Sequence, residues 1–372
     1  MRKFTLSLLA AAAAFGLQTA AADDIVIAGA GPYTGDLAEF GAQLHRGAEQ
    51  AVADVNAAGG VLGNNVVIEF GDDQCDPKQA VAVANDLVSK GVVFVAGHFC
   101  SGSSIPASAV YHEENILQIT PASTNPKFTE DPAAAGWGTV FRTCGRDDQQ
   151  GDFAGGWLAD NFKDKKIAVV HDKSAYGQGL ADLTKAKLNA MGVQEVLYEG
   201  ITAGEQDYTA LVTKLKDAGV EVIYFGGYHP EAALIIRQAH EQGYKPMLLS
   251  GDSLNTLEFA TLAGDAANGV MFTNAAESRN LPSAQEVVQK FRDGGYEPEG
   301  YTLSTYAAIQ VWAAAVEKAG TTEAQAVAAA LRSQSWPTVI GELAFDDKGD
   351  LTSSTYVWYV FENGNYKEAP AM

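Results

Sequence analysis

Two successive series of short apolar strands, each followed by a helix, constrain the fold of this chain more than any other feature. Short strands without polar alternation are typical of parallel sheets whose two faces are covered by helices. The first series is expected to alternate over 23–30, 40–60, 65–73, 77–91, 92–97, 105–115 and 116–120. The second is expected over 147–162, 165–172, 176–192, 193–201, 207–219, 220–228, 230–243, 245–251 and 269–275. These patterns predict an α/β protein with two doubly wound lobes.

The remaining residues are too few, and come too late in the chain, to form a third domain. Helices are expected over 283–294 and 302–319, and strands over 341–347 and 355–364. We expect this tail to complete both lobes, so that the chain crosses between them three times. The predicted first lobe spans 23–144 plus 276–353, and the predicted second lobe spans 145–275 plus 354–372. Ligands of open α/β sheets bind beyond the carboxyl ends of the strands, which places the predicted site between the lobes.

The first 22 residues read as a secretory signal peptide. Arg2 and Lys3 precede an apolar segment that ends in small residues at Ala22. A membrane anchor is the alternative, but it needs about 20 apolar residues and this segment is shorter. We therefore expect a soluble mature protein that starts near Asp23, in a bacterial periplasm or outside the cell, with no segment inserted in a membrane.

The chain is strongly acidic, with a formal net charge of −21 over 372 residues. Such a charge disfavours nucleic acid and anionic membranes as partners. It is consistent with an abundant secreted protein that has to stay soluble.

Three cysteines in an oxidising compartment suggest one disulfide and one free thiol. Cys75 and Cys100 each follow a predicted strand, so both are expected at the same end of neighbouring parallel strands. A bridge between them would close about 26 residues and contribute roughly 3–4 kcal/mol in the chain-entropy model. Zinc bound by the cysteines and His98 is the alternative, but no CxxC or HxxxH spacing supports it. Cys144, the third cysteine, is expected to be a buried small residue.

Two hydroxyl-rich stretches follow neighbouring strands of the first lobe. They are "GHFCSGSSIPAS" at 97–108 and "TPASTNP" at 120–126, which contain Ser101, Ser123 and Thr124. Hydroxyls and backbone N–H groups beside a helix N-terminus are suited to hold a carboxylate. The alternative is that the serines only cap a helix, which is their commoner use.

Strand ends of the second lobe carry a different set of side chains. "HDKSAYGQG", "GGYHPE" and "LLSGDSL" place Tyr176, Tyr228 and Asp252 where they would face the first lobe. Asp252 suits an ammonium group, and tyrosines supply an apolar wall with a polar tip. Together the two lobes would hold an α-amino acid zwitterion.

Two catalytic readings receive less support. "GAGPYTG" at 29–35 resembles a loose dinucleotide fingerprint, but its spacing is GxGxxxG and no helix follows at once. "GHFCSGSS" lacks the GxSxG form of a nucleophile elbow, and the histidines show no Ser–His–Asp arrangement. We therefore expect no enzyme activity, no metal and no cofactor, and keep a nicotinamide-dependent oxidoreductase as the competing class.

Taken together, these motifs resemble those of the periplasmic leucine/isoleucine/valine-binding proteins. The resemblance covers essentially the whole mature chain and rests on long motifs in the same order, such as "DDQCDPKQAVAVAN", "VAGHFCSGSSIPAS", "FRTCGRDDQQG", "VVHDKSAYGQGLA" and "FDDKGDL". It implies a type I periplasmic binding fold with a three-strand hinge and no catalysis. It also implies that the protein delivers an amino acid to an ABC permease in the inner membrane, and we expect a monomer.

The resemblance also implies which residues contact the ligand. The carboxylate contacts of the family match Ser101 and Thr124, beside Cys100 and Ser123. Its ammonium contacts match the carbonyl of Ala122 and the side chain of Asp252. Tyr176 and Tyr228 match residues that close over the ligand, and the family disulfide matches Cys75 and Cys100.

Departures from the family concern specificity. Asp252 stands where these proteins usually carry glutamate, Phe99 where leucine is frequent, and Tyr301 where phenylalanine is frequent. Phe40 and Tyr33 are expected near the mouth of the pocket. These changes predict a pocket narrower than that of a leucine binder, suited to valine, alanine, proline or γ-aminobutyrate. A receptor for γ-aminobutyrate, amides or urea is the alternative within the same fold.

Overall fold

The computed structural model describes residues 24–370. The predicted signal peptide lies outside the described residues. The first part of the chain forms β1 (Ile25–Gly31), α1 (Ala38–Ala57), β2 (Val66–Asp72), α2 (Pro77–Ser89), β3 (Phe94–Gly97), α3 (Ser101–Glu113), β4 (Leu117–Thr120), α4 (Lys127–Ala134) and β5 (Val140–Arg142). Its five strands pair in the order β2-β1-β3-β4-β5, and every pairing is parallel.

The middle of the chain builds a second sheet. Its elements are α5 (Asp147–Phe162), β6 (Ile167–His171), α6 (Ala175–Ala190), β7 (Leu197–Gly200), α7 (Thr209–Ala218), β8 (Val222–Gly226), α8 (His229–Glu241), β9 (Met247–Ser250), η1 (Asp252–Leu254), α9 (Leu257–Ala263), η2 (Gly264–Ala267) and β10 (Met271–Asn274). Two later strands complete this sheet, which runs in the order β14-β13-β10-β9-β8-β6-β7. Strands β6 to β10 pair in parallel, and β13 pairs antiparallel with β10.

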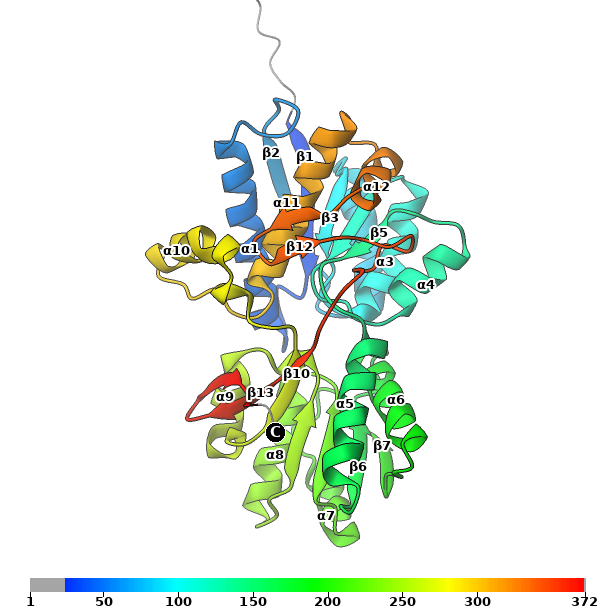
Figure 1. The fold of residues 1–372 in the computed structure, drawn as a ribbon, viewed down its shortest axis with the longest axis vertical. Helices are drawn as coiled ribbons and strands as arrows, with labels where there is room; N and C mark the ends of the chain where they lie inside the picture. The colour runs from blue at the N-terminus through cyan, green and yellow to red at the C-terminus, as the bar shows by residue number, and fades with distance from the viewer. Residues whose placement is uncertain (1–23, 371–372) are drawn as a thin grey trace, which may run out of the picture.

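The last part of the chain contributes elements to both lobes. It forms η3 (Ser278–Asn280), η4 (Pro282–Ala284), α10 (Gln285–Asp293), α11 (Thr302–Ala319), α12 (Ala324–Arg332), β11 (Trp336–Thr338), β12 (Gly341–Leu343), β13 (Val357–Glu362) and β14 (Asn365–Glu368). Helix α11 packs on α1, whereas β13 and β14 join the second sheet. Figure 1 shows the two lobes stacked along the long axis and joined by a few chain segments.

Each sheet is buried on both faces because neighbouring residues of a strand point to opposite sides. Ile27 of β1 belongs to the core under α1, α11 and α12, whereas Ala28 belongs to the core under α2 and α3. In the second lobe Val169 of β6 faces α5 and α6, and Val170 faces α7, α8 and α9. This double burial explains why the strands read as apolar runs without alternation.

No helix among residues 24–370 has both the length and the apolar character needed to cross a bilayer.

Candidate functional site

The first lobe contributes residues from the carboxyl ends of β3 and β4. Phe99 and Cys100 follow β3, and Ser101 is the first residue of α3. This helix begins earlier than the predicted start at residue 105. The predicted range 105–115 put Pro106 in the first turn, where proline is favoured, whereas the structure accommodates it in the second turn. The serines therefore form the N-terminal turn of the helix itself.

Hydrogen bonds within the first lobe determine which hydroxyls remain available. The Ser101 Oγ accepts from the backbone N–H of Asn125 at 3.2 Å, which leaves its own hydrogen to donate elsewhere. The Ser123 hydroxyl lies within 2.9 Å of the Phe99 carbonyl and 2.7 Å of the Ser104 hydroxyl, so it is satisfied inside the lobe. The Thr124 hydroxyl is buried and has no hydrogen-bond partner among residues 24–370.

The second lobe contributes residues from the carboxyl ends of β6, β8 and β9. Tyr176 lies in the first turn of α6, Tyr228 immediately precedes α8, and Asp252 opens the short helix η1. All three side chains are buried. They come from three separate strand ends, and the parallel sheet brings these ends to one edge.

Asp252 is the most densely hydrogen-bonded group of the site. Its Oδ1 accepts from the Tyr176 hydroxyl and from Gln150 Nε2, both at 2.9 Å, and its Oδ2 accepts from the Tyr301 hydroxyl at 2.7 Å. Burial raises the pKa of Asp252, and the bonds from Tyr301 and Tyr176 offset part of that rise. Tyr301 precedes α11 and packs with the first lobe, so this bond spans the two lobes.

A small cavity, of about 10 Å³, lies where the two sets of residues meet. Its lining consists of Phe99, Ser101, Ala122, Tyr176, Tyr228, Asp252, Ser253 and Tyr301. All of these except Ser253 were singled out from the sequence. The structure thus brings Ser101, Ala122 and Asp252, three of the four expected charge contacts, to one small cavity between the lobes, whereas Thr124 does not line it.

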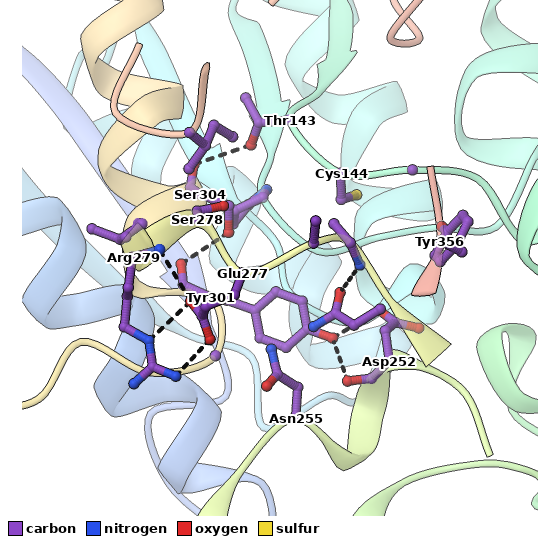
Figure 2. Close-up of a pocket in the computed structure, with 18 of the residues that line it drawn as sticks. Thr143, Cys144, Asp252, Asn255, Glu277, Ser278, Arg279, Tyr301, Ser304 and Tyr356 are labelled. Atoms are coloured by element: carbon purple, nitrogen blue, oxygen red, sulfur yellow. Dashed lines mark hydrogen bonds and ion pairs between the residues drawn. The ribbon is translucent and has the colours of Figure 1, made fainter. Parts of the chain in front are cut away.

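A larger cavity, of about 100 Å³, adjoins the first on the side of the chain crossings. Asp252 and Tyr301 line both cavities, and Thr124, Cys144 and Tyr356 line only the larger one. Figure 2 shows the Tyr301 ring reaching toward Asp252, with Cys144 and Tyr356 beyond it. The predicted ligand residue Thr124 therefore faces the site from its hinge side.

Aromatic rings close the other side of the small cavity. The Phe99 ring stacks on Phe40 at 4.6 Å between centroids and meets the Tyr301 ring edge-on at 4.9 Å. Tyr228 lies 5.2 Å from Tyr176. Tyr33, expected near the mouth, instead packs its ring against Phe70 at 5.5 Å and does not line the cavity. Edge-to-face aromatic packing of this kind leaves little freedom to enlarge the pocket.

The predicted disulfide between Cys75 and Cys100 is confirmed, with a Cα–Cα distance of 5.6 Å. It fixes the residue that precedes Ser101 and thereby the start of α3. His98, considered as a zinc ligand, instead lies between Asp73 (2.5 Å) and the Tyr111 hydroxyl (2.9 Å) in a buried trio. No cluster of three or more metal-binding side chains occurs in the described part of the chain.

Cys144 is a free thiol near the first chain crossing, and it is half-buried rather than fully buried as expected. Burial raises the pKa of this thiol far above its usual range, so it is held as the neutral, unreactive form.

The glycine-rich turn after β1 is occupied by interactions of its own. Asp72 at the end of β2, where a dinucleotide-binding protein would contact ribose, accepts from the backbone N–H groups of Tyr33 (2.9 Å) and Thr34 (3.3 Å). Helix α1 begins only at Ala38, several residues after β1 ends at Gly31. The turn therefore lacks a helix N-terminus directly behind it for a pyrophosphate.

Sequence reasoning missed the residues that support the site from behind. Gln150 of α5 makes two hydrogen bonds with Asp252. Its Nε2 donates to the Asp252 carboxylate, and its Oε1 accepts from the Asp252 backbone N–H at 3.2 Å. Arg142 of β5 donates to the carbonyls of Ser123 (2.6 Å) and Asn125 (3.2 Å), which fixes the loop after β4. A polar residue on an otherwise apolar strand end was the available signal for Arg142.

Comparisons with known proteins show the family to which the chain is similar. A family model described as "Periplasmic binding protein" matches residues 24–365. The "Leu/Ile/Val-binding protein homolog 1" of Brucella melitensis is 51% identical over 365 residues, which is 98% of this chain and 97% of that protein. The "Amino acid binding protein" of Pseudomonas aeruginosa is 51% identical over 366 residues, covering 97% of each chain.

A solved structure with lower sequence identity has a similar fold. The leucine binding protein LivK of Thermotoga maritima superposes with a TM-score of 0.85 at 26% identity, covering 93% of this chain and 98% of that one. The type I periplasmic binding fold with two lobes, expected from the sequence, is thereby confirmed.

Proposed function

This chain belongs to the periplasmic binding protein family, and we propose that it captures a small neutral amino acid between its lobes for an ABC importer. One observation carries the proposal. The buried carboxylate of Asp252 on one lobe and the hydroxyl of Ser101 on the other line one enclosed cavity. An acid and a hydroxyl at a helix N-terminus, held on opposite sides, match the two charges of a zwitterion.

In the proposed pose the ligand carboxylate lies at the N-terminus of α3. The Ser101 hydroxyl retains a hydrogen to donate, because its oxygen already accepts from Asn125. The positive end of a helix of 13 residues adds a favourable field there. The ligand ammonium then lies between the Ala122 carbonyl and Asp252. A ligand that contacts both Ser101 and Asp252 therefore links the two lobes.

The relation between Asp252 and Tyr301 supports a narrow specificity. Aspartate is one methylene shorter than the glutamate that is usual in the leucine/isoleucine/valine binders. The Tyr301 hydroxyl, which a phenylalanine would lack, donates to Asp252 at 2.7 Å. This bond holds the shorter acid toward the first lobe, and the ring occupies space that a larger ligand side chain would need. We infer a preference for alanine, valine, proline or γ-aminobutyrate over leucine.

The remaining features of the proposal concern where the protein works. We propose that residues 1–22 direct export to the periplasm and that the mature chain is a monomer. The lobes are proposed as 23–144 plus 276–353 and 145–275 plus 354–372. An ABC permease of the inner membrane is the proposed partner. The predicted absence of enzyme activity agrees with membership of the family.

A thermal-melt panel on protein that has been unfolded and refolded, to strip bound ligand, tests the proposed function. The panel contains leucine, isoleucine, valine, alanine, proline, glutamate and γ-aminobutyrate. A ligand at one hundred times its Kd stabilises the native state by about 2.7 kcal/mol, which gives a clear rise in Tm. We expect the smaller aliphatic ligands to give the largest shifts. If leucine gives the largest shift, the narrow pocket is wrong, and if none does, amides and urea become the ligands to test.

Replacing Phe99 by leucine should widen the pocket. We expect the affinity for leucine relative to alanine to rise by about tenfold or more, the usual effect of a methylene or two in an apolar pocket. The matched control is Phe94→Leu, because Phe94 stacks on Trp312 in the core of the same lobe and does not line the cavity. Isothermal titration of both amino acids into each variant measures the ratio. An unchanged ratio in Phe99→Leu would show that Phe99 does not limit ligand size.

A further inference from the structure

A second carboxyl group lies buried beside the ligand site. Asp147, the first residue of α5, has no exposed side-chain surface. Neither of its carboxyl oxygens has a hydrogen-bond partner among residues 24–370. Its backbone N–H donates to the Thr124 carbonyl at 2.9 Å, so the residue is tied to the loop that carries the predicted ligand contacts.

The surroundings of Asp147 disfavour its ionised form. Burial and the neighbouring Asp252 raise the pKa of Asp147 well above its usual range, and the Thr124 hydroxyl and Arg142 lower it by less. Asp148, on the same helix, also raises it. A charge without hydrogen bonds costs several kcal/mol in such a place, which favours the neutral form of Asp147.

Arg142 does not neutralise Asp147, because its guanidinium is already engaged. Its Nε pairs with Asp350 at 2.7 Å, and its other nitrogens bond to the loop carbonyls described above. The other titratable groups near Asp147 are the Cys144 thiol and the phenols of Tyr356, Tyr224, Tyr176 and Tyr228. None of these supplies a positive charge.

The Thr124 hydroxyl lowers the pKa of this carboxyl, yet the two groups are not hydrogen-bonded here, and the hydroxyl is buried without a partner among residues 24–370. A hydroxyl has one hydrogen to donate and two lone pairs that accept. An ionised Asp147 would take that hydrogen, and the Thr124 oxygen would then turn only lone pairs toward the ligand. A neutral Asp147 can donate instead, which frees the Thr124 hydrogen.

We propose that Asp147 is a positioning residue of the ligand site, which donates its proton to Thr124 Oγ1 and thereby turns the Thr124 hydroxyl hydrogen toward the ligand carboxylate. This role rests on the proposed function, because it needs an anionic group at the first lobe. It assigns different protonation states to two neighbouring carboxyls. Asp252 is ionised to meet the ammonium, and Asp147 is neutral to organise the carboxylate contact.

The two carboxyls predict opposite limbs of a pH profile. Affinity is lost as the pH falls through the pKa of Asp252, because the ammonium then loses its counter-charge. Affinity is also lost as the pH rises through the pKa of Asp147, because the ionised form reverses the Thr124 hydroxyl. Since the two groups interact, the limbs belong to the pair rather than to either residue alone. The ligand ammonium contributes a further alkaline loss, which is common to every variant.

The test is the Kd of the best ligand from the panel, titrated from about pH 5 to about pH 9 in wild type, Asp147→Asn and Asp148→Asn. The asparagine amide donates to Thr124 at every pH, so the ratio of wild-type to Asp147→Asn Kd should rise with pH above the pKa of Asp147, by at most about tenfold per pH unit, and level off where the ionised form carries the binding. Asp148→Asn is the matched control, because Asp148 pairs with Arg146 at 2.8 Å and half of its side chain is exposed. It should keep the alkaline limb, at slightly lower pH than in wild type, because it removes a charge that raises the pKa of Asp147.

Thr124→Val provides a second measurement that does not depend on the folding of Asp147→Asn. In Thr124→Val, the loss of ligand affinity at alkaline pH that is due to Asp147 should disappear. The double variant Thr124→Val/Asp147→Asn should then have the same pH profile as Thr124→Val. Parallel pH profiles for wild type and Asp147→Asn would overturn the proposal. So would an alkaline limb that survives unchanged in Thr124→Val. Absence of amino-acid binding by wild type at every pH would instead overturn the proposed function itself.

Discussion

Replacing Asp252 by asparagine should reduce amino-acid affinity by between about thirty-fold and several thousand-fold. Removing one partner of a buried charge pair costs about 2–5 kcal/mol, and each 1.4 kcal/mol is tenfold in Kd. The asparagine has nearly the shape of the aspartate, so the loss reports the charge rather than a cavity. It would also set an amide N–H against the donors Tyr176, Tyr301 and Gln150, which now point at the carboxylate.

The measurement is isothermal titration of the preferred ligand into wild type and Asp252→Asn, with the free energy of unfolding of both measured without ligand. Asp265→Asn is the matched control, because Asp265 is exposed on the same lobe and far from the cavity lining. We expect the control to bind as wild type does. Wild-type affinity in Asp252→Asn would show that the ammonium binds elsewhere, and the proposed pose would have to be abandoned.

The arrangement of strand ends was predictable from the sequence because it follows from local patterns. Apolar runs without alternation predicted parallel sheets, and parallel sheets bring the ends of their strands to one edge. Ser101, Tyr228 and Asp252 each lie within four residues of the end of such a run, so their place at the strand ends required no knowledge of long-range packing. The disulfide pair was predicted correctly, but the expected adjacency of its strands was wrong: Cys75 follows β2 and Cys100 follows β3, and β1 lies between these two strands in the sheet.

The hydrogen bonds that hold Asp252 in place could not be predicted, because they join residues far apart in the sequence and no local pattern indicates them. Gln150 reaches Asp252 from a helix in which it looks like any surface glutamine. The Tyr301 hydroxyl bonds to Asp252 across the lobes, whereas the sequence suggested only that its ring adds bulk. The start of α3 was predicted too late, at residue 105, because proline is favoured in the first turn of a helix. In the structure the helix begins at Ser101 and contains Pro106 in its second turn.

Replacing Arg142 by methionine should destabilise the protein by about 3–5 kcal/mol, the usual cost of leaving one partner of a buried ion pair uncompensated. Arg142 has no exposed surface, and its Nε pairs with Asp350, which begins the last crossing toward the second lobe. It also donates to the carbonyls of Ser123 and Asn125. The loop with Ala122 and Thr124 should therefore loosen, and ligand affinity should fall with stability.

Urea unfolding without ligand measures the loss, with Arg292→Met as the matched control. Arg292 is about half exposed, and its one ion pair within residues 24–370 is with the half-exposed Glu297, so its removal should change the free energy of unfolding by about 0.5 kcal/mol or less. Asp350 keeps a second partner in Arg146, at 2.5 Å, so the double variant Arg142→Met/Asp350→Asn should cost less than the sum of its parts. A loss below about 1 kcal/mol in Arg142→Met would show that Arg146 alone neutralises Asp350 and that the loop does not depend on Arg142.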